Sequence, residues 1–175
     1  MEKLLAVTAI GPDRTGLVRD VSQIVTDAGG NIQESRMIAL GSEFALLMLV
    51  AGNWHAIGKI GEKLEKLQEQ THLTITTRDS APRSDKKSAP YAIDIVALDH
   101  EGIVFGLSAF FAARELEIAE MNTRRYRAPH TGAPMFSVQM TVNVPSNIQV
   151  SSLRDEFLEY CETENLDAII EPAER

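Results

Sequence analysis

The sequence predicts an α+β fold made of two ferredoxin-like βαββαβ domains, each an antiparallel four-stranded sheet with both helices on one face. The first observation behind this prediction is an internal repeat. Residues 6–18 align without gaps with residues 92–104, so that Asp13 pairs with Asp99. The second observation is that each copy contains the same order of strands and helices. Further along, Phe44 pairs with Phe136, because the second copy has a longer turn within residues 128–134.

The first copy is predicted over residues 1–80. Its apolar and β-branched runs predict strands at Lys3 to Ile10, Asn31 to Leu40, Glu43 to Ala51 and Thr71 to Thr77. A turn at Gly41-Ser42 makes the middle two strands antiparallel. Apolar residues at helical spacing predict two helices, the first of which ends at Gly29-Gly30. Their apolar stripes are Leu17, Val18, Val21, Ile24, Val25 and Ala28 in the first, and Trp54, Ile57, Ile60, Gly61, Leu64 and Leu67 in the second.

The second copy, over residues 91–175, repeats this order. Its strands are predicted at Tyr91 to Leu98, Ile118 to Arg127, Met135 to Val144 and Leu166 to Ile170. Its helices carry Ile103, Leu107, Phe110 and Phe111, and then Leu153, Phe157 and Cys161. Residues 81–90 are polar and bracketed by prolines, which predicts a linker. The strand segment 44–50 is apolar on both alternating faces, so we expect the sister copy or another chain to cover the open face of its sheet.

Charge makes direct binding to nucleic acid an unfavoured function. The chain has 17 basic and 25 acidic residues, a net charge of -8, and residues 91–175 hold 14 acidic and 6 basic side chains. Binding to a phosphate backbone normally needs a basic face. The run Arg124-Arg125-Tyr126-Arg127 is a local exception that could meet an anionic partner or a nucleic-acid backbone. A charged, solvated edge strand is the favoured explanation, and a contact with another protein is the second.

Composition also bears on location and chemistry. The chain has one cysteine, no signal-peptide start and no apolar run of membrane-spanning length, which predicts a cytoplasmic protein that does not enter a membrane. The histidines lack metal-ligand spacing, and no paired base and nucleophile or phosphate loop is found. We therefore expect no metal, no cofactor, no catalytic residue and no enzymatic activity.

The loop after the first strand is the candidate binding site. Between Gly11 and Gly16 the chain turns from a strand into a helix, whose first N–H groups would suit a carboxylate. Asp13 can accept hydrogen bonds from an ammonium group, and Gly16 allows close approach of a ligand. A free amino acid carries both charges. The alternative is that Asp13 or Thr15 only caps the helix and that Gly16 only eases packing.

The residues Asp13-Arg14-Thr15-Gly16, followed by Asn31-Ile32 in a duplicated βαββαβ pattern, resemble the ACT domain family of small-molecule regulatory modules. The doubled, stand-alone arrangement is similar to the group of this family that represses transcription of the glycine cleavage system. The resemblance implies that domains pair edge to edge. An amino acid would then bind where the first loop of one domain meets the second strand of its neighbour.

Position by position, the resemblance implies ligand contacts for Gly11, Asp13, Arg14, Thr15, Gly16 and Asn31 in the first copy. In the second copy Asp99 and Gly102 match the motif. Glu101 and Glu117 replace Thr15 and Asn31, and acidic groups there would oppose a ligand carboxylate. We therefore expect one good type of site, completed across copies or across chains.

The leading hypothesis is an amino-acid-responsive regulatory protein that forms homo-oligomers. Its expected partners are a small amino acid, glycine being one candidate, and a DNA-binding transcription regulator. The alternative is a ligand-independent protein-interaction module whose ACT sites are degenerate, as Glu101 and Glu117 would indicate. An enzyme is the third and least favoured hypothesis, because a ferredoxin-like fold alone does not decide function.

Overall fold

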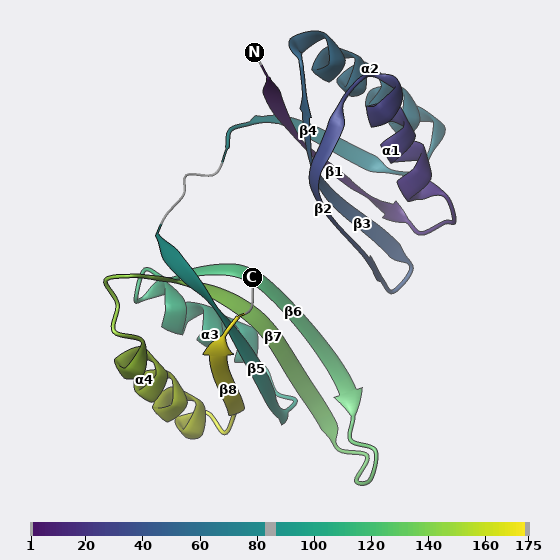
Figure 1. Cartoon of the computed structure of the whole chain (residues 1–175). Coiled ribbons are helices and arrows are strands. Elements are labelled where there is room, and N and C mark those ends of the chain that lie inside the picture. Colours follow the sequence, from purple (N-terminus) through teal and green to yellow (C-terminus); the bar gives the residue numbers. More distant parts are fainter. Residues whose placement is uncertain (1, 83–86, 174–175) are drawn as a thin grey trace. The chain divides into compact units, whose positions relative to one another are not determined.

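The computed structural model in Figure 1 describes residues 2–82 and 87–173. It divides into two compact units, Met1–Ser84 and Asp85–Arg175. Each unit is a βαββαβ fold with an antiparallel four-stranded sheet, as predicted. Of the predicted linker 81–90, residues 83–86 lie outside the described residues, and a strand begins at Ser88, earlier than expected.

Unit 1 has the strand order β2-β3-β1-β4. Its elements are β1 (Lys3–Pro12), α1 (Leu17–Asp27), β2 (Asn31–Leu40), β3 (Glu43–Gly52), α2 (Trp54–Gln70) and β4 (Thr74–Ser80). Leu40 pairs with Glu43, so the predicted turn at Gly41-Ser42 is confirmed. The last strand begins three residues later than predicted, because α2 continues to Gln70 and Thr71 is its C-cap residue.

Unit 2 has the matching order β6-β7-β5-β8. Its elements are β5 (Ser88–Leu98), α3 (Ile103–Ala112), β6 (Glu117–Arg127), β7 (Pro134–Pro145), α4 (Val150–Thr163) and β8 (Asp167–Pro172). The same β-bulge recurs in both units, between Ile32 and Glu34 and between Ile118 and Glu120. The two halves of the chain therefore share both topology and a local irregularity.

The core of each unit lies between the sheet and its helices. In β1 the alternating residues Leu5, Val7 and Ala9 are buried, as the period of a strand requires. They pack with the buried stripes of α1 and α2. In unit 2 the corresponding core contains Phe111 and Phe157, whose ring centroids are 5.2 Å apart. Figure 1 shows the two helices of each unit on one face of its sheet.

Two residues expected to be covered are exposed. Trp54 is 73% exposed, although helical spacing placed it on the apolar stripe of α2. It is the first residue of that helix, and helical side chains lean toward the N-terminus, so its ring projects past the end of the packed region. Leu47, on the face of the sheet opposite the helices, is 53% exposed within its unit. The expectation that another copy or chain covers this face stays a prediction.

The part of the chain that the structure describes contains no candidate membrane-spanning helix. None of the helices in residues 2–82 and 87–173 combines the length and the apolar character needed to cross a bilayer.

Candidate functional site

The loop between β1 and α1 presents an open helix N-terminus. Gly16 is the N-cap residue of α1, with φ 95° and ψ -4°, and no side chain caps the helix. The alternative in which Asp13 or Thr15 serves as the cap is therefore wrong. The first intrahelical bond runs from the amide of Asp20 to the carbonyl of Gly16, at 2.9 Å. The amides before Asp20 have no acceptor within the helix, which leaves partial positive charge facing the loop.

Helix α2 shows what a capped N-terminus looks like in the same unit. The side-chain oxygen of Asn53 accepts hydrogen bonds from the amides of His55 and Ala56, at 3.1 and 2.9 Å. The start of α4, like those of α1 and α3, has no side-chain cap. What sets α1 and α3 apart is that their N-cap residue is a glycine with a left-handed backbone, so no side chain extends from the cap position into the loop.

Asp13 is fixed by its backbone and leaves its carboxylate exposed. Its amide donates a 2.9 Å hydrogen bond to the carbonyl of Ser42, in the turn between β2 and β3. Among residues 2–82 and 87–173 the carboxylate of Asp13 forms no ion pair. A negative charge therefore lies beside the open end of α1, and it is available to an ammonium group.

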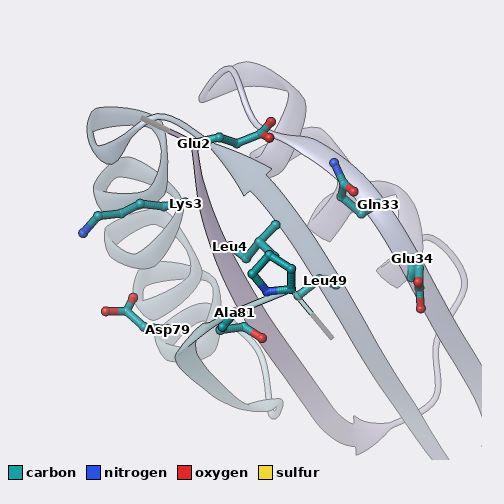
Figure 2. A pocket seen from close by; sticks show the side chains of 10 residues that line it. Glu2, Lys3, Leu4, Gln33, Glu34, Leu49, Asp79 and Ala81 are labelled. Carbon is teal, nitrogen blue, oxygen red and sulfur yellow. The ribbon is translucent and has the colours of Figure 1, made fainter. Parts of the chain in front are cut away.

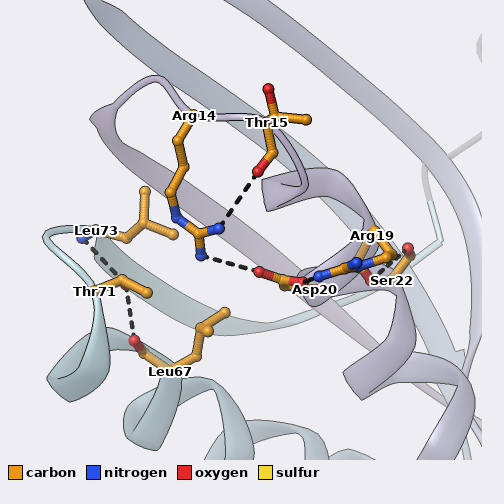
Figure 3. A network of polar contacts seen from close by, with 8 residues as sticks. All are labelled: Arg14, Thr15, Arg19, Asp20, Ser22, Leu67, Thr71 and Leu73. Carbon is orange, nitrogen blue, oxygen red and sulfur yellow. Dashed lines mark hydrogen bonds and ion pairs between the residues drawn. The ribbon is translucent and has the colours of Figure 1, made fainter.

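Gly11 has a packing role that the sequence did not reveal. A Cβ atom at this position would lie 2.6 Å from the carbonyl oxygen of His72, so β1 approaches the start of β4 too closely for a side chain. Thr71 holds this second segment in place. Its hydroxyl donates to the carbonyl of Leu67 at 2.8 Å and accepts from the amide of Leu73 at 3.4 Å. Figure 3 shows the two hydrogen bonds of Thr71.

Arg14 belongs to an ion-pair cluster at the start of α1. Figure 3 shows the carboxylate of Asp20 between two guanidinium groups, at 2.9 Å from Arg14 and 2.7 Å from Arg19. Hydrogen bonds from Arg19, and then from Arg14, lower the pKa of Asp20 from its ordinary value. Arg14 also reaches the carbonyl of Thr15 at 3.5 Å. Two guanidinium groups and one carboxylate give the cluster a net charge of one positive unit beside the loop. This charge can contribute to the binding of an anion.

Asn31 lies at the opposite end of unit 1. It pairs with Ala51, and Ala51 pairs with Leu4, whereas Gly11 pairs with Phe44. Seven positions of β1 separate Leu4 from Gly11, which is roughly 24 Å at the rise of a strand. Unit 1 therefore brings together the predicted residues from Gly11 to Gly16 but not Asn31.

A pocket of about 590 Å³ opens at the same end of the sheet as Asn31. In Figure 2, Gln33 and Glu34 on β2 lie across from Lys3 and Asp79, with Leu49 between them. Gln33 is the extra residue of the β-bulge. The pocket is shallow and contains no residue of the predicted site, so it marks the surface around the start of β2 rather than the loop itself.

The corresponding loop of unit 2 has the same backbone and different charges. Gly102 has φ 92° and ψ -6°, α3 again has no side-chain cap, and the amide of Asp99 donates to the carbonyl of Pro134 at 2.9 Å. Here, however, the carboxylate of Asp99 forms an ion pair with Arg125 of β6. The acidic group that would accept an ammonium is thus already neutralised within the unit.

Metal binding finds no support in the described residues. Within residues 2–82 and 87–173, no group of three histidine, cysteine, aspartate or glutamate side chains lies close enough together to hold an ion. Burial raises the pKa of Cys161 to about 11, so its thiol stays protonated at neutral pH.

Comparisons with known proteins identify the family to which the domains that carry these loops belong. The model of the ACT domain matches residues 3–78. The glycine cleavage system transcriptional repressors of Escherichia coli (strain K12) and Shigella flexneri are each 30% identical to the chain over 158 residues, which cover 90% of this chain and 83% of the relative. The chain belongs to the ACT domain family.

Two crystal structures resemble this tandem ACT domain protein over its whole length. A protein assigned as a glycine cleavage system transcriptional repressor has a TM-score of 0.75 at 26% identity, with coverage of 100% of this chain and 99% of that chain. A protein of unknown function from Galdieria sulphuraria has a TM-score of 0.85 at 26% identity, with coverage of 99% and 100%. The similarity to known proteins therefore includes both ACT domains.

Sequence reasoning missed the partners of the ACT loops. Asp20 and Arg19 stand in the first turn of α1, where an acidic residue near a helix N-terminus is an available signal. Ser42 acts only through its backbone, and no side-chain pattern indicates such a contact. Arg125 was noted only as part of a basic run, because its pairing with Asp99 depends on strand positions in the folded ACT domain.

Proposed function

We propose that this tandem ACT domain protein is an amino-acid-responsive regulator of transcription that acts through contact with a DNA-binding regulator protein. A regulatory role is supported by its similarity to transcriptional repressors. The observation that carries the amino-acid response is the loop of unit 1, where α1 begins without a side-chain cap and its N-cap residue, Gly16, comes three residues after Asp13. The carboxylate of Asp13 forms no ion pair within residues 2–82 and 87–173. This pair of features matches the two charges of an amino acid.

In the proposed complex, the ligand carboxylate accepts hydrogen bonds from the first amides of α1, with Arg14 adding positive charge nearby. Its ammonium group donates to Asp13. Thr15 and Gly16 form the rest of the loop, and Gly11 precedes it near the end of β1. The left-handed glycine at position 16 keeps the approach free of a side chain. Small ligands such as glycine suit this loop, and the name of the relatives supports testing glycine first.

Asn31 would be supplied by a neighbouring ACT domain. Because it lies roughly 24 Å from the loop within unit 1, one domain cannot place both on the same ligand. We therefore propose that the chain forms a homo-oligomer in which the β2 strand of one domain approaches the loop of another. The domains would be those predicted, residues 1–80 and 91–175, with the second extended to Ser88 at the start of β5 and the linker between them shortened accordingly.

The loop of unit 2 would be the weaker site. Asp99 and Gly102 keep the motif, but the ion pair to Arg125 competes with a ligand ammonium, and Glu101 adds a negative charge close to the expected carboxylate. We assign ligand binding mainly to the first ACT domain and place the protein in the cytoplasm. Contact with DNA is assigned to the partner regulator rather than to this acidic chain.

The test is calorimetric titration of the full chain with glycine, alanine and serine. We expect at least one of them to release heat, and Asp13→Asn to weaken its binding by about 10- to 100-fold, because asparagine lacks the negative charge that strengthens a hydrogen bond from the ligand ammonium. The matched control is Asp99→Asn, which should leave binding within about twofold of the wild-type value. No heat from any of the three amino acids would refute the proposed response.

A second candidate is a protein-interaction module that does not respond to a ligand. The ion pair between Asp99 and Arg125 favours it, because that contact closes one of the two loops. Capture of the regulator that is unaffected by added amino acids would support this candidate over the first. In either case, the purified chain alone should give no specific band in a gel shift at moderate salt.

A further inference from the structure

Helix α3 of unit 2 has an outer face that is unusually apolar. None of its ten residues, Ile103–Ala112, is charged. The inner face is buried against the sheet, and the outer face carries Val104, Phe105, Ala109 and Ala112. Phe105 is 79% exposed and Val104 is 39% exposed. Ser108 is the one polar residue of the helix, and exposed apolar side chains such as Phe105 mark a surface suited to contact another molecule.

The equivalent helix of unit 1 shows that Phe105 is what distinguishes the outer face of α3, since Val104 has an exposed counterpart in Val18. In the internal repeat, Phe105 and Gly106 take the positions of Arg19 and Asp20. Arg19 and Asp20 form an ion pair at 2.7 Å on the surface of α1. The charged, self-paired surface of one copy is thus replaced in the other by an exposed aromatic ring and a glycine.

A pocket of about 370 Å³ lies beside this face, between α3 and α4. Phe105, Gly106 and Phe110 line one side and Tyr160 the other. A Cβ atom at Gly106 would be 2.4 Å from the hydroxyl oxygen of Tyr160, so the glycine makes room for the tyrosine. The rings of Phe110 and Tyr160 are 5.1 Å apart. The guanidinium of Arg114 already lies over the ring of Phe110, 3.7 Å from its centroid, so the ring left to receive an apolar side chain is that of the exposed Phe105.

The edge of the pocket is negatively charged. Glu101 and Glu164 line it and are exposed, and neither forms an ion pair within residues 2–82 and 87–173. His100 lies beside them, with its ring nitrogen 3.0 Å from the carbonyl of Glu101. The nearby Arg114 is already bound to Glu156 at 2.8 Å. An apolar surface bordered by unpaired carboxylates is complementary to an apolar segment that carries lysine or arginine.

We propose that the outer face of α3 and the adjoining pocket, together called the α3 surface, bind an amphipathic basic helix of a partner protein. Apolar side chains of that helix would cover Val104 and Phe105, and a lysine or arginine would reach Glu101 and Glu164. The inference deepens the proposed function, on which it rests for the existence of a protein partner. It adds the kind of segment that the partner would present.

The test uses two synthetic helical peptides of about 18 residues, long enough to form a helix, with the same leucine pattern. One carries lysine on its polar face and the other carries glutamate. Each is labelled with a fluorophore, and binding to the full chain is followed by anisotropy at about 0.15 M salt. We expect the lysine peptide to bind at least tenfold more tightly than the glutamate peptide.

Variants then locate the binding. Phe105→Ala should weaken binding of the lysine peptide about tenfold or more, because exposed aromatic residues carry much of the affinity of such surfaces. Glu164→Gln should weaken it less and reduce its dependence on salt. The matched control is Trp54→Ala, which removes another exposed aromatic ring, that of unit 1, and should leave binding within about twofold of the wild-type value.

Three results would overturn the inference. The first is equal binding of both peptides, or of neither, and the second is unchanged binding to Phe105→Ala. The third is a dimer in sedimentation that Phe105→Ala dissociates, because a second copy would then occupy the α3 surface. Failure of amino-acid binding in calorimetry would refute the proposed response alone, since these peptide titrations contain no amino acid.

Discussion

The contact between Gly106 and Tyr160 predicts that Gly106→Ala changes the stability of unit 2 in opposite directions, depending on whether residue 160 is tyrosine or phenylalanine. Substitution of Gly106 by alanine places a Cβ atom 2.4 Å from the tyrosine hydroxyl oxygen, while the next nearest atom, Cζ of the same ring, is 3.7 Å away. Tyr160 cannot move away freely, because its ring packs on Phe110. The clash therefore depends on one oxygen atom, and Tyr160→Phe removes that atom without changing the ring.

Two opposing effects set the magnitude. Replacing glycine by alanine inside a helix stabilises by about 1 kcal/mol, and overpacking costs about 1–3 kcal/mol. In the wild-type background we expect Gly106→Ala to destabilise unit 2 by about 1 kcal/mol. In the Tyr160→Phe background the added methyl group makes only an ordinary contact, so the same substitution should stabilise by about 0.5–1 kcal/mol. The coupling free energy between the two positions would then be close to 2 kcal/mol, in the range measured for residues in contact.

Hydrogen exchange measured by mass spectrometry gives the opening free energy of α3 in the full chain, and peptides from β1 report on unit 1 in the same sample. Gly58→Ala in α2 is the matched control. Nothing lies within 4 Å of an added Cβ there, so it should stabilise unit 1 by up to about 1 kcal/mol. If Gly106→Ala shifts the opening free energy equally in both backgrounds, the tyrosine hydroxyl is not the obstacle and the reasoning fails.

Other expected outcomes follow from the loops and from two titrating groups. Gly16→Ala and Gly102→Ala should each destabilise its own unit by about 1–2 kcal/mol in urea unfolding, because both glycines have left-handed backbones, and asparagine at either position should cost less. Because the arginines lower the pKa of Asp20, its contribution to stability is complete above the ordinary pKa of 3.8 and is lost as the pH falls through the lower value of the folded state. Acid titration of Asp20→Asn should lack this component. Because burial raises the pKa of Cys161 from 9.0 to about 11, the contribution of its protonated thiol to the stability of unit 2 is complete below pH 9 and is lost as the pH rises toward about 11. Labelling by a thiol reagent at pH 8 should follow the unfolding of unit 2.

The fold was predictable because the internal repeat and the hydrophobic periods agree. The glycine turn between β2 and β3 fixed the pairing of Leu40 with Glu43, and strand alternation indicated which residues of β1 are buried. Trp54 shows where periodicity fails, since spacing alone does not tell that a first-turn side chain points beyond the sheet. The β-bulge at Gln33 had no sequence signal, because any residue can be the extra one.

The candidate site was predictable in its backbone and only partly in its charges. The positions of Gly16 and Gly102 indicated a turn into a helix, and the structure places a left-handed glycine at each. The sequence did not indicate that Asp99 meets Arg125, because Asp99 lies in the loop after β5 and Arg125 in β6, and only the folded sheet brings the two together. For the same reason, the separation of Asn31 from the loop became evident only from the strand pairings.

The internal neutralisation of Asp99 bears on how steeply such a protein can respond. A chain with two equal receptors can switch over a narrow range of ligand concentration, whereas a chain with one follows a simple hyperbola. Because the ion pair between Asp99 and Arg125 makes the second loop the weaker site, we expect a sigmoidal dose–response curve to come mainly from association between chains. Duplication of the ACT domain would then have given the two halves different roles, with ligand binding mainly in the first, rather than a steeper response to ligand concentration.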